Sequence, residues 1–333
     1  MEQPTQPTPA SSARGRAAAR SSRTTAQSDP HPLAPLVQKY GERFSSLIAP
    51  VLAADDVEVV HDLRVVTRRL EQALLALCPE GTPKPVKRMR RTLRRIRRAL
   101  GPWRNCDVAL AMTSKRRRQT RSPRRRAAWD LVHHFLEQRR LEECVRARRK
   151  LLRKDLQGVA HRLETALREL LPAAPAERLH AFVQSGVNDA WTRWCEVCAR
   201  AEADRNVTSI HALRIATKRL RYHVELAREL GDIAADPLLD WCRELQERLG
   251  DWHDHQMLQQ SMAEAFARPE VLLSDVDVVQ AGLVELARER GAFPPDDPNI
   301  LAEARAGAGH EAIARWLGRL QEPVASVADF TKG

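Results

Sequence analysis

Aromatic residues and β-forming runs are both scarce in this chain of 333 residues. It contains two tyrosines and six phenylalanines, and aromatic residues make up 5% of the sequence. No stretch alternates Val, Ile, Thr or aromatic residues over several positions, so a β-sheet has little to form from. Ala, Leu, Arg and Glu dominate instead, and all four favour helix. The composition therefore predicts an all-α protein.

The chain also lacks a long apolar run and a signal-peptide core. No segment approaches the roughly 20 apolar residues that a membrane-spanning helix needs. Cysteine is sparse, and nothing else suggests a disulfide-rich secreted scaffold. We therefore expect a cytoplasmic protein with no membrane association and with reduced thiols at Cys78, Cys106, Cys144, Cys195, Cys198 and Cys242.

Acidic residues are almost missing from one segment. Between Lys84 and Arg126 the sequence has eighteen Lys or Arg residues and a single acid, Asp107, which leaves a local charge of +17. The whole chain carries +12, so the remainder is net acidic. A protein made soluble by charge alone would mix the two signs. This concentration predicts an anionic partner.

Helix-breaking residues indicate how the chain is divided. Residues 1–32 form a basic Pro/Ser-rich tail that cannot bury a core. Helical patterning then runs to about residue 290, with breaks that include Gly101-Pro102 and Gly250-Asp251. The predicted organisation is a disordered tail (1–32), a helical domain (33–290) with one repeat at about 33–172 and another at about 176–290, and a short helix with a tail (291–333).

An internal repeat supports that division. Residues 60–70 read VHDLRVVTRRL, and residues 210–220 read IHALRIATKRL, an offset of 150. Farther on, LGPWRN at residues 100–105 is matched by LGDWHD at 249–254, an offset of 149. Two motifs in the same order at nearly constant spacing indicate a tandem duplication of a helical unit.

Each repeated helix separates an apolar stripe from a basic stripe. At 100° per residue, His61, Arg64 and Arg68 share one narrow face, and Leu63, Val66 and Leu70 lie opposite. The second copy repeats the pattern with His211, Arg214 and Lys218. A solvated face does not require particular residue types, whereas a shared ligand does. The recurrence therefore favours a binding site over a solvated surface.

The chemistry of these stripes suits a phosphate polymer. Arg donates in a bidentate manner to phosphate oxygens, and Lys adds a mobile charge. Nucleic-acid binders usually add stacking aromatics, and none is interleaved with the basic stripes. The predicted helix at about 85–100 has one apolar seam and is otherwise almost entirely basic. Like charges at this spacing repel, and a bound polyanion would relieve the repulsion.

The paired His-x-x-Arg-x-x-x-Arg/Lys-Arg-Leu helices and the paired Leu-Gly-x-Trp loops resemble the CHAD domain, the conserved histidine α-helical domain. The resemblance spans about residues 33–290. It implies two four-helix bundles with pseudo-twofold symmetry around a basic central cavity that binds inorganic polyphosphate. It also implies a non-catalytic protein without cofactor or metal, located at polyphosphate granules. Some members are fused to or paired with CYTH-type triphosphatases.

The resemblance also assigns residues. The positions that match the family's basic helices and loops, and hence the predicted polyphosphate-binding residues, are His61, Arg64, Arg68, Arg69, Arg91, Arg94, Arg95, Arg98, Arg104, His211, Arg214, Lys218, Arg219, Arg221 and His253. The first loop departs from the family pattern, because Asn105 stands where an Asp is usual. The Glu-x-Glu-x-Lys signature of a CYTH triphosphatase is missing.

Five questions stay open. Non-specific RNA or DNA binding would follow from any strongly basic segment, as the main role or as a weak side activity. A helical His-Asp metal phosphohydrolase would use His61-Asp62 or His253-Asp254, although guanidinium groups beside the first doublet oppose a cation. Cys195-x-x-Cys198 fits core packing better than half of a metal or redox site. The basic runs 115–118 and 124–126 fit a basic loop or an added phosphate-binding lip, and a homo-oligomer is equally open.

Overall fold

The structure, a computed structural model, describes residues 31–319 except 79, 174–177, 273–274 and 306. The described residues form α-helices, one short 3-10 helix and connecting turns, and no strand occurs among them. The predicted all-α class is thus confirmed. The predicted tail lies outside the described part up to residue 30, as do the last residues after Arg319. No helix in the described part combines the length and apolarity needed to cross a membrane.

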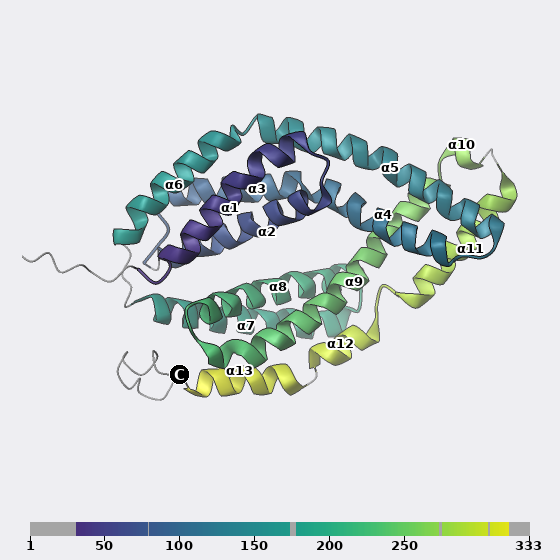
Figure 1. The fold of residues 1–333 in the computed structure, drawn as a ribbon. Coiled ribbons are helices and arrows are strands. Elements are labelled where there is room, and N and C mark those ends of the chain that lie inside the picture. Colours follow the sequence, from purple (N-terminus) through teal and green to yellow (C-terminus); the bar gives the residue numbers. More distant parts are fainter. Residues whose placement is uncertain (1–30, 79, 174–177, 273–274, 306, 320–333) are drawn as a thin grey trace, which may run out of the picture. The chain divides into compact units, whose positions relative to one another are not determined.

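The first half of the chain packs one group of helices around α1 and α2. Asp56 precedes α2 and accepts the backbone N–H of Glu58 at 2.8 Å, which satisfies a free donor at the helix start. Helix α1 packs on α2 and α6, and α3 packs on α2 and α5 (Figure 1). The helices are α1 Ala34–Ala53, α2 Val57–Ala76, α3 Lys84–Ala99, α4 Gly101–Gln119, α5 Pro123–Leu152 and α6 Leu156–Ala173.

The helix pair at the start of the first half has a counterpart in the second half. Asn206 precedes α8 and forms a capping box with Ser209, the counterpart of the Asp56 cap. Helix α8 packs on α7 and α9. The elements are α7 Leu179–Asp204, α8 Val207–Glu229, η2 Ile233–Ala235, α9 Asp236–Phe266, α10 Pro269–Leu272, α11 Val276–Ala292, α12 Pro298–Arg305 and α13 Gly307–Arg319.

The two Leu-Gly-x-Trp motifs have different backbones. In the first half α3 ends before Leu100 and α4 begins at Gly101, with Pro102 in its first turn. Proline has no N–H and clashes with the preceding turn, so it forces a new start. Asp251 stands at the same point of the second copy, and α9 continues through Gly250 without interruption. The predicted break at Gly250-Asp251 is therefore wrong.

Residues after 290 contribute to the core, although the sequence placed them outside the main domain. The predicted terminal helix is present as α12 and α13. Ile300, Leu301 and Trp316 are buried in the same core cluster as α7, α8 and the first half of α9. Trp316 also donates its indole N–H to Asp232 at 2.7 Å. The second half of the fold is thus completed by helices that follow the predicted repeat.

Helices from both halves meet in a separate core. Helix α11 packs against α5 and α9, and α4 and α5 also contact α9. Trp129 from α5 is buried there with Leu258 and Met262 from α9. Gly282 of α11 allows a close approach, because a Cβ at that position would overlap the ring of Phe266. The sequence did not indicate this shared group, and the pseudo-twofold arrangement of two bundles stays a prediction.

Candidate functional site

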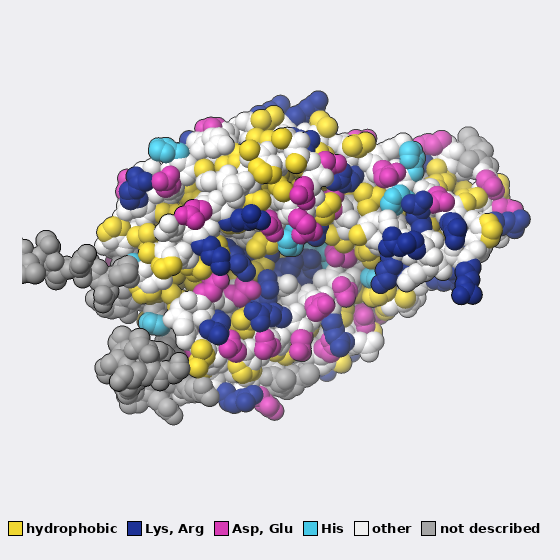
Figure 2. Space-filling view, viewed as in Figure 1, with side chains coloured by type: hydrophobic (Ala, Val, Ile, Leu, Met, Phe, Trp, Pro, Cys, Tyr) yellow, Lys and Arg dark blue, Asp and Glu magenta, His cyan; other side chains and the backbone are white. Residues whose placement is uncertain are grey.

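The basic stripes of α2 and α8 face each other. Leu63 and Leu70 of α2 are fully buried, as are Leu213 and Leu220 of α8, so the opposite, basic faces turn away from each helix's own core. The two helices contact each other directly, and Figure 2 shows Lys and Arg side chains gathered between the two layers of helices. We call the resulting group the α2–α8 cluster: His61, Arg64, Arg68, Arg97, Arg104, His211, Arg214, Lys218, Arg221 and His253.

Arg64 lies at the point where α2, α3 and α4 meet. Its Nη1 donates to the backbone oxygen of Arg97 at 2.7 Å. A Cβ at Gly101 would lie 3.3 Å from the same nitrogen, so the glycine leaves room for the guanidinium. Burial lowers the pKa of Arg64 to about 10, helped by the charges of Arg97, Arg104 and Arg214. The charged form is thus held in a poorly solvated, positively charged place.

Arg68 connects the two repeats. Its Nη1 donates to the hydroxyl of Tyr222 on α8, and its guanidinium lies over the Tyr222 ring at 4.8 Å from the centroid. Arg221 approaches the same ring at 5.1 Å. Burial and the neighbouring cations, Arg97 and Arg64 first among them, lower the pKa of Arg68 to about 9. The tyrosine therefore holds guanidinium groups from both halves close together.

Lys218 is a buried cation that faces cations of both repeats. Burial, then the charges of Arg214 on its own helix and of Arg68 and Arg64 across from it, lower its pKa to about 7. The carboxylate of Asp254 on α9 acts in the opposite direction. Arg214 has a buried Nε without a hydrogen-bond partner among the described residues. Several cations are therefore held close together, and at least one of their hydrogen-bond donors has no partner. In a structural ion pair, by contrast, each cation is neutralised by a carboxylate.

The three histidines of the cluster, His61, His211 and His253, lie beside Arg104 or Arg214. The rings of His211 and His253 are 5.2 Å apart between centroids. Burial and the charge of Arg214 lower the pKa of His253 to about 3. The pKa values of His211 and His61 are also lowered, first by burial and then by Arg214 and Arg104 respectively. All three are therefore neutral near pH 7 in the unliganded protein, and an anion beside them would favour protonation.

Helix α3 contributes to the cluster through residues that the sequence analysis did not select. The buried carboxylate of Glu71 on α2 pairs with Arg90 at 3.5 Å, with Arg97 at 3.1 Å and with Arg94. This anchor fixes Arg97 beside Arg64 and Arg68. Of the three, only Arg94 was predicted. Residues 90, 94 and 97 lie at helical spacing on the side of α3 next to its apolar seam, and that spacing was the available signal.

Several predicted residues lie elsewhere. Arg91, Arg95 and Arg98 are exposed on another side of α3. Arg219 lines a pocket between α7 and α8 with Asp189 and Arg193 and does not face α2. The structure therefore separates these four from the α2–α8 cluster. Their predicted contact with polyphosphate stays a prediction, and it cannot involve the same surface.

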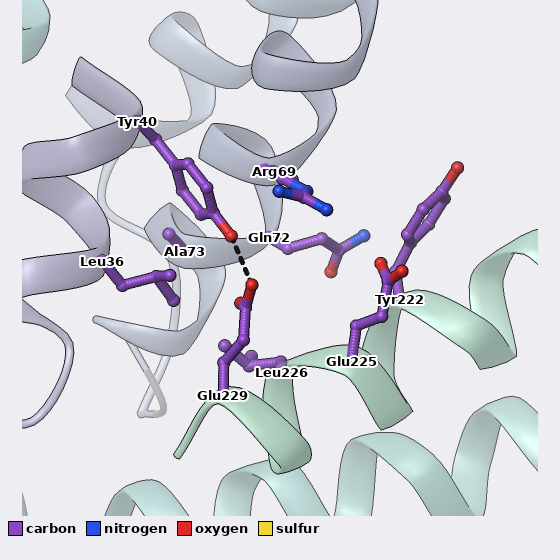
Figure 3. Close-up of a pocket in the computed structure, with 9 residues that line it drawn as sticks. All are labelled: Leu36, Tyr40, Arg69, Gln72, Ala73, Tyr222, Glu225, Leu226 and Glu229. Carbon is purple, nitrogen blue, oxygen red and sulfur yellow. Dashed lines mark hydrogen bonds between the residues drawn. The ribbon is translucent and has the colours of Figure 1, made fainter. Parts of the chain in front are cut away.

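Arg69 occupies a smaller pocket at one end of the contact between α2 and α8 (Figure 3). There the hydroxyl of Tyr40 donates to Glu229 at 2.7 Å, and Arg69 lies 5.5 Å from the Tyr40 ring centroid. Arg221 pairs with Glu225 at 3.1 Å. Carboxylates thus accompany the cations at this end. The pocket ties α1 and α2 to α8 and leaves the uncompensated charge farther along the helices.

Residues of the metal-site and cysteine-site alternatives have other partners or are buried. Asp62 of the first His-Asp doublet pairs with Arg43, and His255, which follows the second doublet directly, bonds Glu289 at 3.0 Å. No group of three or more His, Cys, Asp or Glu side chains in the described part is arranged to hold a metal ion. All six cysteines are free thiols, as expected. Burial raises the pKa of Cys198 to about 11, which favours the unreactive thiol form.

Comparison with known proteins agrees with the all-α fold. The profile of the CHAD domain matches residues 37–263. The crystal structure of the CHAD domain from the plant Ricinus communis is similar, with a TM-score of 0.62 and 21% sequence identity over 83% of this chain and 90% of that chain. At this identity the likeness shows the fold alone. No curated protein matches the chain.

Proposed function

The chain belongs to the CHAD domain family, and from that premise we propose that it is a non-catalytic protein that binds inorganic polyphosphate through the α2–α8 cluster. The polymer would lie between the two repeats and accept hydrogen bonds from guanidinium groups of both. Arg64, Arg68, Arg214 and Lys218 are poorly solvated in the unliganded protein. The negative charge of the phosphates would stabilise their charged forms in place of water.

One observation carries this proposal. Cations from two repeated helices are held against one another, partly buried, with pKa values lowered by burial and mutual repulsion. Such an arrangement weakens the folded state, and proteins retain it where a ligand compensates. A linear polymer with one charge per phosphate can satisfy donors on both helices at once. A single small anion would reach only part of the cluster.

The aromatic residues favour polyphosphate over nucleic acid. Tyr222 is 9% exposed and is already covered by Arg68 and Arg221, so its ring is not available to a base. Trp252, which belongs to the repeated loop motif, is 1% exposed. The cluster therefore offers phosphate donors without a stacking platform. Non-specific binding of RNA or DNA remains the alternative, and it predicts equal competition per phosphate.

The test is a competition experiment with wild-type protein and the double variant Arg64→Glu with Arg214→Glu. Long-chain polyphosphate and single-stranded DNA compete for one labelled polyphosphate at physiological salt. We expect polyphosphate to compete better per phosphate, and the double variant to bind at least about 100-fold more weakly, because several phosphate contacts are lost together. Helicity by circular dichroism should not change.

A matched control separates the site from general charge. Arg149→Glu with Arg200→Glu makes the same change in net charge at two exposed arginines outside the cluster. We expect it to reduce the affinity less than about threefold, through long-range electrostatics alone. Normal binding by the cluster variant, or equal losses in the two variants, would contradict the proposed site. Equal competition by DNA would contradict polyphosphate specificity.

The cellular role follows as part of the same proposal. A polyphosphate-binding protein of this kind would be found at polyphosphate granules in the cytoplasm and would meet enzymes that metabolise the polymer, such as CYTH-type triphosphatases. Imaging a tagged copy with and without the polymer-synthesising enzyme tests the location. A diffuse signal that does not respond to loss of the polymer would argue against it.

A further inference from the structure

Helix α3 presents two basic sides with different electrostatic surroundings. On one side Arg90, Arg94 and Arg97 share the buried carboxylate of Glu71, and Arg97 joins the α2–α8 cluster. Consecutive residues on a helix are 100° apart, so Arg98 points to a different side from Arg97. Among the described residues, no carboxylate pairs with Arg91, Arg95 or Arg98 on that second side, and these arginines are not part of the cluster.

The second side borders a groove between α3 and the end of α5. Arg95 and Arg98 from α3 face Lys150 from α5 and Lys154 just after it. Ile96, Ala99 and Leu151 complete the lining, which contains no acidic and no aromatic side chain. Ile96 and Leu151 are fully buried, so the groove has an apolar floor. The stems of the basic side chains can lie on this floor with their charges toward solvent.

The cations of the groove are not used by the fold. None of Arg95, Arg98, Lys150 and Lys154 forms an ion pair with a described carboxylate. On the other side of α3, by contrast, Arg90, Arg94 and Arg97 all pair with Glu71. The nearby Asp155 is occupied, since it accepts the backbone N–H of Gly158 at 3.1 Å and lies 3.7 Å from Arg162. Four unpaired cations in one groove attract a multivalent anion.

We propose that the α3–α5 groove is a second phosphate-polymer site, separate from the α2–α8 cluster, so that one molecule holds two polymer segments at once. The identity of the ligand rests on the proposed function, whereas the site rests on the lining of the groove. Arginine and lysine without aromatic neighbours suit a phosphate backbone better than bases. Helix α3 contributes Arg97 to the cluster and Arg95 and Arg98 to the groove, so two sites on different sides of this helix would make the protein a bivalent cross-linker of long polyphosphate.

The substitutions all lie at the end of α5 or just after it. Lys150→Glu with Lys154→Glu reverses two charges that line the groove, and Arg149→Glu with Arg153→Glu reverses two exposed charges beside it that do not. The probe for counting sites is inorganic tripolyphosphate, which is too short to bridge. Calorimetric titration should give about two binding events for wild type and for the control, and about one for the groove variant.

Cross-linking is measured with long-chain polyphosphate. Light scattering should rise steeply with wild type and with the control, and should fall by at least about fivefold with the groove variant. A variant carrying Arg64→Glu with Arg214→Glu should keep one weaker binding event, which the added Lys150→Glu and Lys154→Glu remove. Circular dichroism checks that each variant remains folded.

The outcomes separate the two proposals. A single tripolyphosphate per wild-type molecule, or two per molecule in the groove variant, overturns the second site and leaves the α2–α8 cluster intact. Loss of binding in the groove variant together with normal binding in the Arg64/Arg214 variant overturns the proposed function and retains the groove. Absence of any polyphosphate binding by wild type overturns both.

Discussion

Two regions of the molecule are rich in arginine and differ in the carboxylates that face them. Where α4 and α5 meet α11, Arg125 bonds Glu285 and Arg116 bonds Glu289, both at 2.6 Å. The indole N–H of Trp129 adds a bond to Glu285 at 3.1 Å. In the α2–α8 cluster, Glu71 and Glu225 pair with Arg97 and Arg221 at the edges. Arg64, Arg68 and Lys218, by contrast, face other cations across the two repeats.

The comparison separates two uses of the same side chain. Burial raises the pKa of Glu285, but bonds from Arg125 and Trp129 outweigh it, so the pKa lies below its usual value and the pair is ionised. In the cluster burial and repulsion both lower the pKa values of the cations. In the first region carboxylates of the protein neutralise the arginines, so we call it the complete region. In the second region cations remain that only a ligand would neutralise, so we call it the incomplete region. Within the basic runs 115–118 and 124–126, Arg116, Arg124 and Arg125 pair with carboxylates of α11. The phosphate-binding lip that the sequence also allowed stays a prediction.

The largest expected effect on stability comes from breaking the complete region. Glu285→Gln leaves Arg125 and the indole of Trp129 facing a neutral amide in a buried place. We expect a loss of about 3 kcal/mol in the free energy of unfolding, measured by urea denaturation. Polyphosphate affinity at a temperature where the variant is folded should change less than about twofold, because the α2–α8 cluster is not touched.

A surface pair supplies the control. Arg193 and Glu196 are bonded at 2.6 Å, yet both side chains are more than half exposed. Glu196→Gln should cost no more than about 0.5 kcal/mol. Similar losses in the two variants would show that the Glu285 network is no stronger than a surface pair. The contrast between a complete and an incomplete region would then lose its basis.

The pH dependence of binding probes the incomplete region. The pKa of Lys218 is lowered from 10.5 to about 7, by burial first and then by Arg214, Arg68 and Arg64, while Asp254 opposes the shift. A bound polyanion favours the charged form and raises this pKa. Below about pH 7 the lysine is already protonated, and above it binding must take up a proton. Affinity should therefore fall by up to about tenfold for each pH unit above 7.

The measurement is calorimetric titration with polyphosphate in buffers of different ionisation enthalpy, which counts protons taken up. Lys218→Met should weaken binding and reduce both the proton uptake and the slope with pH. The histidines have lowered pKa values as well, so His253→Gln serves as the comparison for their share. An affinity that rises with pH, or an uptake that Lys218→Met leaves unchanged, would contradict the reading of the cluster.

The sequence predicted the helices and the two basic stripes because both depend on short-range periodicity. His61, Arg64 and Arg68 were placed on one face by a 100° step, and the repeat predicted their equivalents on α8. The break at residue 250 was wrong because Gly and Asp were taken together as a turn signal. A helix interior tolerates one glycine, whereas Pro102 does not allow the same continuation in the first copy.

The remaining parts of the site depend on contacts that no local pattern encodes. Glu71 reads as one polar residue of α2, and its role appears only when α3 packs beside it. Tyr222 sits on the basic side of α8 and holds Arg68 and Arg221 together across the repeats, so the prediction that no aromatic residue is interleaved with the basic stripes is wrong at this position. Arg95 and Arg98 are the same residue type as Arg94 and lie on the same helix. They belong to the α3–α5 groove because the packing of α5 gives that side of α3 different neighbours.

The smallest expected effect compares Asp254 of α9 with the equivalent position of the first repeat, Asn105 of α4. Asp254 lies among Arg214, Lys218 and Arg104, and burial raises its pKa against their influence. Asn105, its counterpart in the first repeat, is exposed. Asp254→Asn removes a carboxylate that competes with the polymer for Arg214, so affinity should increase about threefold. Asn105→Asp adds a charge in solvent and should reduce affinity by less than about twofold.

Both variants are measured in the same polyphosphate titration at about 150 mM salt and again at about 500 mM, where screening removes more of an exposed charge's effect than of a buried one's. The gain from Asp254→Asn should persist at the higher salt, and the small loss from Asn105→Asp should disappear. A larger effect at Asn105 than at Asp254 would mean that the polymer passes closer to the start of α4 than to α9. The uncompensated charge between α2 and α8 would then not be the centre of binding.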